Sequence, residues 1–294
     1  MTLLEGPWPA RATWVLLPLV LGPALGDALA DHSRSVAVAA SVMAWLVWAG
    51  VLVAVLLPTT ASLTALRIAA PAALVVADWA ALAGPGGAAA LVAVAGTAVV
   101  LVIAFSPLTG HAFVNGSAYG DERRYTLRVP AALLLGPIVL TEAAAVVPPV
   151  AGVLLLACHR WVAGLLVLGL GLPLATGAVW ILHGLARRWV VFVPAGFVLH
   201  DPHTMIDPVL FPRETIASLG PAPAEPAPDA LDASQRALGP ILQIELRDAV
   251  ELAPRRGAKA AELVTTDTVL FAVTRPGPML AEATRRRLPT GGVG

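Results

Sequence analysis

The sequence predicts an α+β membrane protein, in which a six-helix transmembrane bundle is followed by a small cytoplasmic β-barrel or sandwich with a C-terminal helix. Three observations predict this class. Of the 294 residues, 57% are hydrophobic and 13% are charged, which is far from the composition of soluble globular proteins. Six apolar runs are long enough to cross a bilayer. After Arg187 the pattern changes to short runs of β-branched and aromatic residues between turn signals.

Each predicted span has about 20 mainly apolar residues, enough to cross roughly 30 Å of hydrocarbon. The spans lie at 14–30, 36–57, 61–82, 88–106, 131–157 and 161–186, within a transmembrane domain of residues 1–186. The fifth span contains Pro148 and Pro149, which lack amide donors, so we expect it to kink or to end early. A seventh span, made by dividing 149–186, would bury His159 and Arg160 near the middle of the membrane and is rejected.

The arginines predict the orientation, because positive charge is retained preferentially on the cytoplasmic side. With the N-terminus inside, most arginines near the spans lie on or near the cytoplasmic face, at Arg11, Arg67, Arg123, Arg124, Arg128, Arg187 and Arg188. Only Arg34 and Arg160 remain outside. Six spans return the chain to the cytoplasm, so we predict a multi-pass protein of the inner (plasma) membrane with both termini in the cytoplasm.

Charge and motif content argue against several functional classes. The 19 basic residues balance 19 acidic residues, without the basic excess that nucleic-acid binding usually requires. The single cysteine, Cys158, has no partner for an intrachain disulfide. The sequence has no Walker loop, no GxGxxG after a strand, and no HExxH, CxxC or GxSxG motif. We therefore predict no catalytic residue, metal site or cofactor, although an active site assembled from scattered residues stays open.

The C-terminal module is predicted to contain several short strands. Trp189–Val193 and Phe197–His200 flank the turn residues 194–196 and should form a hairpin. Further strands are expected where apolar and polar residues alternate, at 207–211, 241–252 and 263–273. A helix should begin near Pro278 and end the module.

The order of these elements resembles the bacterial PH-like domain. The matching stretches are RRWVVFVPAGFVLHD, DPVLFPRETIASLG, ILQIELRDAVELAP, LVTTDTVLFAVTRP and PMLAEATRRRL, within residues 187–290. Multi-pass actinobacterial membrane proteins of unassigned role carry such domains directly after membrane helices. The resemblance rests on element order and implies a binding or assembly module in a bent, partly open barrel, with no reaction. The chain departs from the simplest pattern at 220–230, a Pro/Ala-rich segment that we expect to be a disordered loop within the module.

One set of candidate residues contains basic and aromatic side chains at the two ends of the module. We expect them to contact membrane lipids or a protein partner, because arginines reach lipid phosphates and an indole favours the membrane interface. These residues are Arg187, Arg188, Trp189, Arg285, Arg286 and Arg287. The alternative is that the first cluster only sets the topology and that the second is a solvated helix end.

A second set contains the acidic residues in or at the ends of the spans, Asp27, Asp78 and Glu142, where an ionisable group is energetically expensive. Asp27 and Asp78 should lie near one face of the membrane, where they either form a polar site with nearby acidic and histidine side chains or are simply hydrated. Glu142 should lie deeper, as part of a functional site or as a protonated carboxyl hydrogen-bonded between helices.

The polar loop 109–128 lies between the fourth and fifth spans and has two interpretations. It is either a solvated connection whose arginines set the topology, or a segment that docks on the C-terminal module or on lipid headgroups.

Two functions are compatible with these patterns. The first is a non-enzymatic membrane scaffold or accessory subunit, which presents the module to membrane lipids and other membrane proteins and does not bind nucleic acid. The second is a transporter or intramembrane enzyme that uses Asp27, Asp78 and Glu142. The second function requires several ionisable groups at one depth on facing helices.

The predicted topology can be tested with reporter fusions after Gly87 and after Gly294. We expect opposite signals, because the third span ends outside and the chain ends in the cytoplasm. The same signal from both fusions would contradict the six-span topology.

Overall fold

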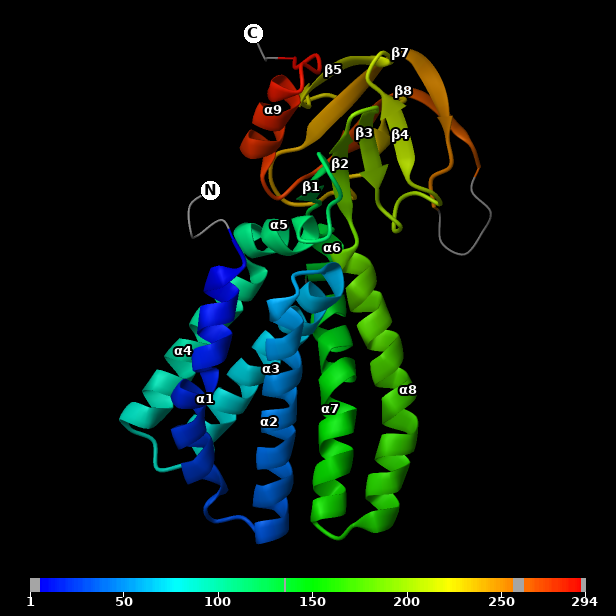
Figure 1. The fold of residues 1–294 in the computed structure, drawn as a ribbon. Coiled ribbons are helices and arrows are strands. Elements are labelled where there is room, and N and C mark those ends of the chain that lie inside the picture. The colour runs from blue at the N-terminus through cyan, green and yellow to red at the C-terminus, as the bar shows by residue number, and fades with distance from the viewer. Residues whose placement is uncertain (1–5, 135, 256–261, 292–294) are drawn as a thin grey trace. The chain divides into compact units, whose positions relative to one another are not determined.

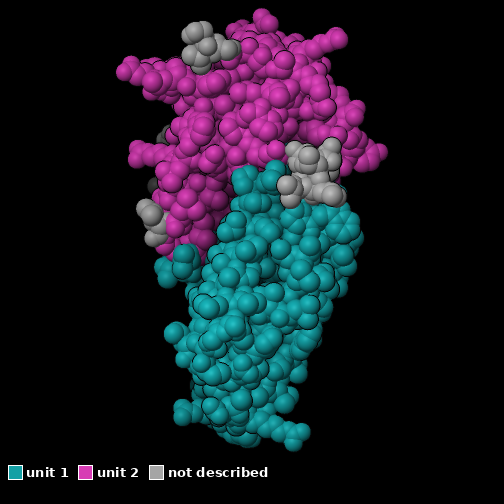
Figure 2. Space-filling model, turned by 90° about the vertical axis from the view of Figure 1, so that its left-hand side faces the viewer, with its two compact units in different colours: residues 1–116, 139–183 teal, residues 117–138, 184–294 magenta. Residues whose placement is uncertain are grey.

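The computed structural model describes residues 6–134, 136–255 and 262–291 (Figure 1). The chain divides into two compact units, the first made of residues 1–116 and 139–183 and the second of residues 117–138 and 184–294 (Figure 2). The second unit therefore begins close to the predicted boundary at 186, but it also includes residues 117–138. The chain passes between the two units three times as a result.

Among the described residues, six helices are long and apolar enough to cross a membrane. They are α1 (Trp8–Leu29), α2 (Arg34–Leu56), α3 (Thr60–Ala83), α4 (Ala88–Phe105), α7 (Pro137–Ala157) and α8 (Trp161–Ala186). A short helix, α5 (Pro107–Asn115), follows α4. These helices agree with the predicted spans and support a multi-pass membrane protein.

The fifth span differs from the prediction at its start. A single span over 131–157 was expected, but the structure has a four-residue helix, α6 (Ala131–Leu134), before α7 begins at Pro137. Pro148 and Pro149 lie inside α7, and the helix continues to Ala157. The proline pair therefore does not end the span.

Small residues bring the helices of the first unit close together. Ala28 of α1, Ala77 and Ala80 of α3 and Ala93 of α4 share one buried cluster. Helices α7 and α8 also approach closely, because a Cβ atom on Gly152 would lie only 2.5 Å from the Cγ atom of Leu168. Such contacts permit the dispersion interactions that hold helices together when lipid surrounds them.

Arginines bind the carbonyl groups at two helix ends. Arg11 Nε and Nη2 donate to the carbonyl oxygens of Val55 (3.0 Å) and Leu56 (2.8 Å) at the end of α2. Arg67 Nε donates to the carbonyl oxygen of Ala104 (3.3 Å) at the end of α4. The last carbonyls of a helix lack intrahelical partners and carry the negative end of the helix dipole. These two arginines therefore stabilise the fold, in addition to any effect on topology.

The strands described in the second unit form two four-stranded sheets. The first has the order β1-β2-β3-β4, with β1 (Arg123–Thr126), β2 (Trp189–Val193), β3 (Gly196–His200) and β4 (Val209–Pro212). The second has the order β5-β7-β8-β6, with β5 (Ile216–Pro221), β6 (Leu231–Asp232), β7 (Leu242–Leu252) and β8 (Val264–Phe271). Neighbouring strands are antiparallel, apart from β6 and β8, and helix α9 (Pro276–Arg285) follows β8.

The predicted hairpin, later strands and final helix are all present, with ends that are unchanged or shifted by at most three residues. Strands β1, β5 and β6 were not predicted. In the Pro/Ala segment 220–230, Gly220 and Pro221 belong to β5, and residues 222–230 lie in no helix or strand. The described strands form two separate sheets and do not form a closed barrel.

Strand β1 comes from the polar loop between α5 and α7. It pairs with β2, and Tyr125 lies opposite Val190. Immediately after β1, the chain also pairs with the end of the second sheet. The Thr274 amide donates to the Thr126 carbonyl (2.9 Å), and the Arg128 amide donates to the Ala272 carbonyl (2.8 Å). Residues 123–128 therefore connect the two sheets, which supports the interpretation that this loop docks on the module.

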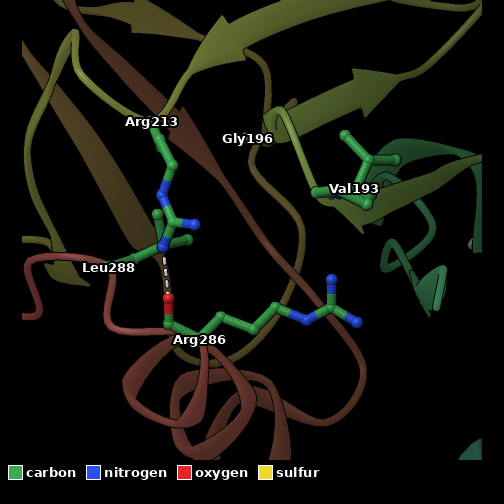
Figure 3. Close-up of a pocket in the computed structure, with 6 residues that line it drawn as sticks. Val193, Gly196, Arg213, Arg286 and Leu288 are labelled. Atoms are coloured by element: carbon green, nitrogen blue, oxygen red, sulfur yellow. Dashed lines mark hydrogen bonds between the residues drawn. The ribbon is translucent and has the colours of Figure 1, made fainter.

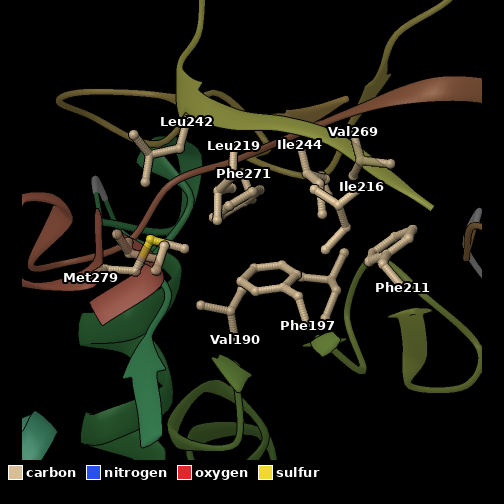
Figure 4. Packing of buried hydrophobic residues seen from close by; sticks show 14 of the residues in the cluster. Val190, Phe197, Phe211, Ile216, Leu219, Leu242, Ile244, Val269, Phe271 and Met279 are labelled. Carbon is tan, nitrogen blue, oxygen red and sulfur yellow. The ribbon is translucent and has the colours of Figure 1, made fainter. Parts of the chain in front are cut away.

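Both sheets and α9 contribute to one hydrophobic core (Figure 4). The ring of Phe197 lies at its centre, with centroid distances of 5.4 Å to Phe192, 6.4 Å to Phe211 and 5.5 Å to Phe271. Met279 of α9 is fully buried in the same cluster. Alternation along the strands places these side chains on one face of each sheet, so burial of that face drives the two sheets together.

The two tyrosines of the chain provide a test of the β1 assignment. Tyr125 is 6% exposed, its ring lies 5.9 Å from that of Phe192, and its hydroxyl group donates to the Pro278 carbonyl at 3.2 Å. We expect Tyr125→Ala to lower the opening free energy of β2, measured by hydrogen exchange of the full chain, by about 3–5 kcal/mol. Tyr119 is 87% exposed, so Tyr119→Ala should change it by less than about 0.5 kcal/mol. Similar effects of the two substitutions would contradict the assignment.

Candidate functional site at the helix–sheet junction

A buried ion pair lies where the chain leaves α8 and enters the first sheet. Arg188 Nε and Nη2 donate to Asp201 Oδ1 (2.8 Å) and Oδ2 (2.7 Å). The two side chains are 2% and 0% exposed. Arg188 Nη1 also donates to the carbonyl oxygen of Arg128 at 3.0 Å. One guanidinium group therefore ties together the start of β2, the end of β3 and the inserted segment 123–128.

The β2–β3 hairpin positions this pair. Its register places Trp189 opposite His200, so the next position brings Arg188 opposite Asp201. The close approach of β4 to the start of β3 requires glycine at position 196, because a Cβ atom there would lie 2.1 Å from the carbonyl oxygen of Phe211.

The electrostatics of the pair favour the charged carboxylate. Burial alone would raise the pKa of Asp201, but the hydrogen bonds and charge of Arg188, together with the His203 amide, lower the pKa below its ordinary value. This carboxyl group therefore stabilises the fold above its ordinary pKa, and that contribution is lost as the pH falls through the lowered value.

Trp189 lies on the opposite face of the first sheet from the core. The His200 ring stacks on the indole with a centroid distance of 4.6 Å and an interplanar angle of 7°. The guanidinium of Arg124 lies 5.5 Å from the indole centroid. Because β2 lies between β1 and β3, these two groups come from the strands on either side of Trp189. Trp189 is half-buried beside them.

The six predicted contact residues divide into two groups. Arg187, Arg285 and Arg287 are exposed. Arg188 is buried in its ion pair, so it does not present its side chain to lipid or a partner as predicted, and Trp189 is half-buried beside His200 and Arg124. The physical reason is that Arg188 has a buried carboxylate partner, which the sequence-based interpretation did not include.

The remaining predicted residue, Arg286, is also engaged. Its side chain is 19% exposed and its Nε atom donates to Glu282 Oε1 at 2.6 Å. Its Nη2 atom donates to the Asp121 carbonyl, and its guanidinium lies 5.9 Å from the centroid of Phe192. Arg285 forms an ion pair with the same Glu282, whose side chain is buried.

A small pocket lies beside the C-terminal end of α9 (Figure 3). Its volume is about 130 Å³, and it is lined by Val193, Pro194, Gly196, Arg213, Arg286 and Leu288. Arg213 donates through Nη2 to the Arg286 carbonyl, so it caps the end of α9 as Arg11 caps α2. Sequence analysis did not identify Arg213, because nothing near it in the chain indicates that α9 is its partner.

The predicted intramembrane acids lie at opposite ends of the first unit. Asp27 and Asp78 are exposed near the ends of α1 and α3, which pack together. Ser35, at the start of α2, donates to the Ala157 carbonyl at the end of α7 (2.8 Å), so α7 ends at the same side. Glu142 lies in the second turn of α7, about 22 Å along the helix from Ala157. The structure therefore does not bring the three acids into one site.

The start of α7 also changes the interpretation of Glu142. A span over 131–157 would place it well inside the membrane, but α7 starts at Pro137, only five residues before it.

Among residues 6–134, 136–255 and 262–291, no group of three or more His, Cys, Asp or Glu side chains is arranged to hold a metal ion.

Comparisons of this chain with family models, with curated proteins and with solved structures gave no match.

The role of the buried pair predicts different effects for two adjacent arginines. We expect Arg188→Ala to lower the opening free energy of β2 and β3 by about 3–5 kcal/mol, because it leaves the Asp201 carboxylate buried without its partner. Arg187→Ala removes an exposed guanidinium and should change that energy by less than about 0.5 kcal/mol. Hydrogen exchange of the full chain measures both effects. A small effect of Arg188→Ala would show that the pair does not hold this junction.

Proposed function

We propose that the protein is a non-enzymatic integral membrane scaffold or accessory subunit. Its six helices hold a PH-like, sheet-containing module at the cytoplasmic face of the inner (plasma) membrane for lipid or protein contacts. The observation that carries the proposal is that the sheet unit is assembled from two separate parts of the chain, residues 117–138 and 184–294. Because a segment between membrane helices completes the module, the chain connects the module covalently to those helices at three points. The orientation follows from the arginine distribution.

Five arginines, four of them exposed, supply the contact surface in this proposal. The surface, termed the basic end, consists of Arg123, Arg213, Arg285, Arg286 and Arg287. Its members are linked, because Arg213 donates to the Arg286 carbonyl and Arg286 donates to the Asp121 carbonyl near Arg123. Glu282 is buried and pairs with both Arg285 and Arg286. One carboxylate therefore balances only one of the three positive charges of Arg285, Arg286 and Arg287 at the end of α9. Each basic group near an anionic leaflet contributes about 1 kcal/mol, so the basic end suits anionic lipid headgroups.

The alternative is a transporter or intramembrane enzyme that uses Asp27, Asp78 and Glu142. This function needs ionisable groups at one depth. The position of Glu142 near the start of α7, and of Asp27 and Asp78 at the side where α7 ends, argues against one shared site.

Lipid contact can be tested with the full chain in nanodiscs that contain zwitterionic lipid and a photoreactive anionic lipid. Replacing both Arg285 and Arg287 with Ala should reduce cross-linking of the anionic lipid to α9 peptides by about fivefold for each arginine. The control replaces Arg236 and Arg247, two exposed arginines outside the basic end, and should leave this cross-linking unchanged. Equal cross-linking in the double variant and the wild type would exclude lipid contact through these arginines and favour a protein partner.

A further inference from the structure

His203 lies in a tight turn that packs on the last turn of α8. Its Cε1 atom is 3.0 Å from the position that a Cβ atom on Gly184 would occupy, so the imidazole approaches the helix where glycine provides room. The amides of Thr204 (3.1 Å) and Met205 (2.9 Å) donate to the Asp201 carbonyl and hold the turn. The His203 amide donates to Asp201 Oδ1 at 3.1 Å. The turn thus connects the buried ion pair to α8.

The surroundings of the ring favour a neutral imidazole. Its Nδ1 atom is buried and has no hydrogen-bond partner among the described residues. Arg188 and Arg255 place positive charge near the ring, while Asp201 is the nearby negative group and is already paired with Arg188. From the other elements in contact, α8 contributes Gly184, and Gln235 donates to the His203 carbonyl at 3.5 Å. A proton on Nδ1 would therefore add a second buried positive charge beside a guanidinium.

We propose that His203 makes the joint between α8 and the first sheet sensitive to acid, because protonation of its imidazole releases the 201–205 turn from Gly184. In the released turn, both ring nitrogens reach water and the charged ring is solvated. The released sheet is then freer to move relative to the last turn of α8. This inference concerns the fold and does not depend on the proposed function.

The direction of the pH effect follows from the two states of the turn. Burial, with help from Arg188 and Arg255, lowers the pKa of His203 in the packed turn below its ordinary value of 6.5, and Asp201 only partly opposes this. Above 6.5 the ring is neutral in both states, and the packed turn keeps its full stability. Below pH 6.5 the imidazole is protonated in the released turn, where its pKa is ordinary, but stays neutral in the packed turn. The packed turn therefore loses stability as the pH falls, until the pH reaches the lowered pKa of the packed state.

Hydrogen exchange of the full chain in detergent, from about pH 7.5 to about pH 5, tests the proposal once rates are corrected for intrinsic exchange. Exchange of the Thr204 and Met205 amides should accelerate by about tenfold for each pH unit below 6.5, until the lowered pKa is reached. The variant His203→Phe should show no such acceleration, since its ring cannot take up a proton. The control His200→Gln removes a neighbouring histidine and should keep the wild-type response.

Two results would overturn the proposal. One is a wild-type chain without acceleration, and the other is an equal acceleration in His203→Phe, which would assign the effect to another group. If His203→Phe does not fold, His203→Gln provides the same test, because its amide side chain does not take up a proton in this pH range. We expect the acid response to be lost in His203→Gln. A wild-type response in that variant would contradict the proposal.

Discussion

The sheet unit depends on the backbone pairing of residues 123–128, which lie between β2 of the first sheet and the end of β8. On one side β1 forms the edge of the first sheet, and on the other Arg128 and Thr126 pair with Ala272 and Thr274. Without this segment, β2 would have an unpaired edge. The hydrophobic core would also lack the side chain of Tyr125. The partners are far apart in sequence, since Thr126 and Thr274 are separated by 148 positions. The second unit can therefore be completed only after the six long helices described above have been synthesised. Formation of the two units is coupled as a result.

Arginine hydrogen bonds to backbone carbonyls are the second recurring interaction. Arg11, Arg67 and Arg213 donate to carbonyls at the ends of α2, α4 and α9, and Arg188 donates to the Arg128 carbonyl. A guanidinium has five donors in a rigid fork, so one side chain can satisfy several acceptors. Among the arginines predicted to contact lipid or a partner, Arg188 is instead used by the fold in this way. These contacts also show that an arginine near the end of a span can be needed by the fold as well as by the topology.

The features predicted correctly are those encoded locally. A long apolar run identifies a span by itself, and the β2–β3 hairpin lies within 12 residues of sequence. Strand β1 was missed because its partner strand lies more than 60 residues away, and its arginines suggested a solvated loop.

The Arg188–Asp201 pair could have been predicted from the length of the hairpin turn. The predicted turn contained three residues, whereas the observed turn contains Pro194 and Ala195, and this difference of one residue changes every cross-strand partner. With the two-residue turn, the opposite charges of Arg188 and Asp201 face each other.

The most direct test of this account is a disulfide between the inserted segment and the end of the second sheet. The hydroxyl oxygens of Thr126 and Thr274 are 2.7 Å apart, a separation compatible with a disulfide after Thr126→Cys and Thr274→Cys. Cys158 is the single native cysteine and can be replaced by Ser. Mild oxidation of the full chain should link the two positions within one molecule, as detected by mass spectrometry of the linked peptides, and neither single-cysteine variant should give that product. Failure to form the link, or a link only between different molecules, would contradict the claim that residues 123–128 complete the sheet unit.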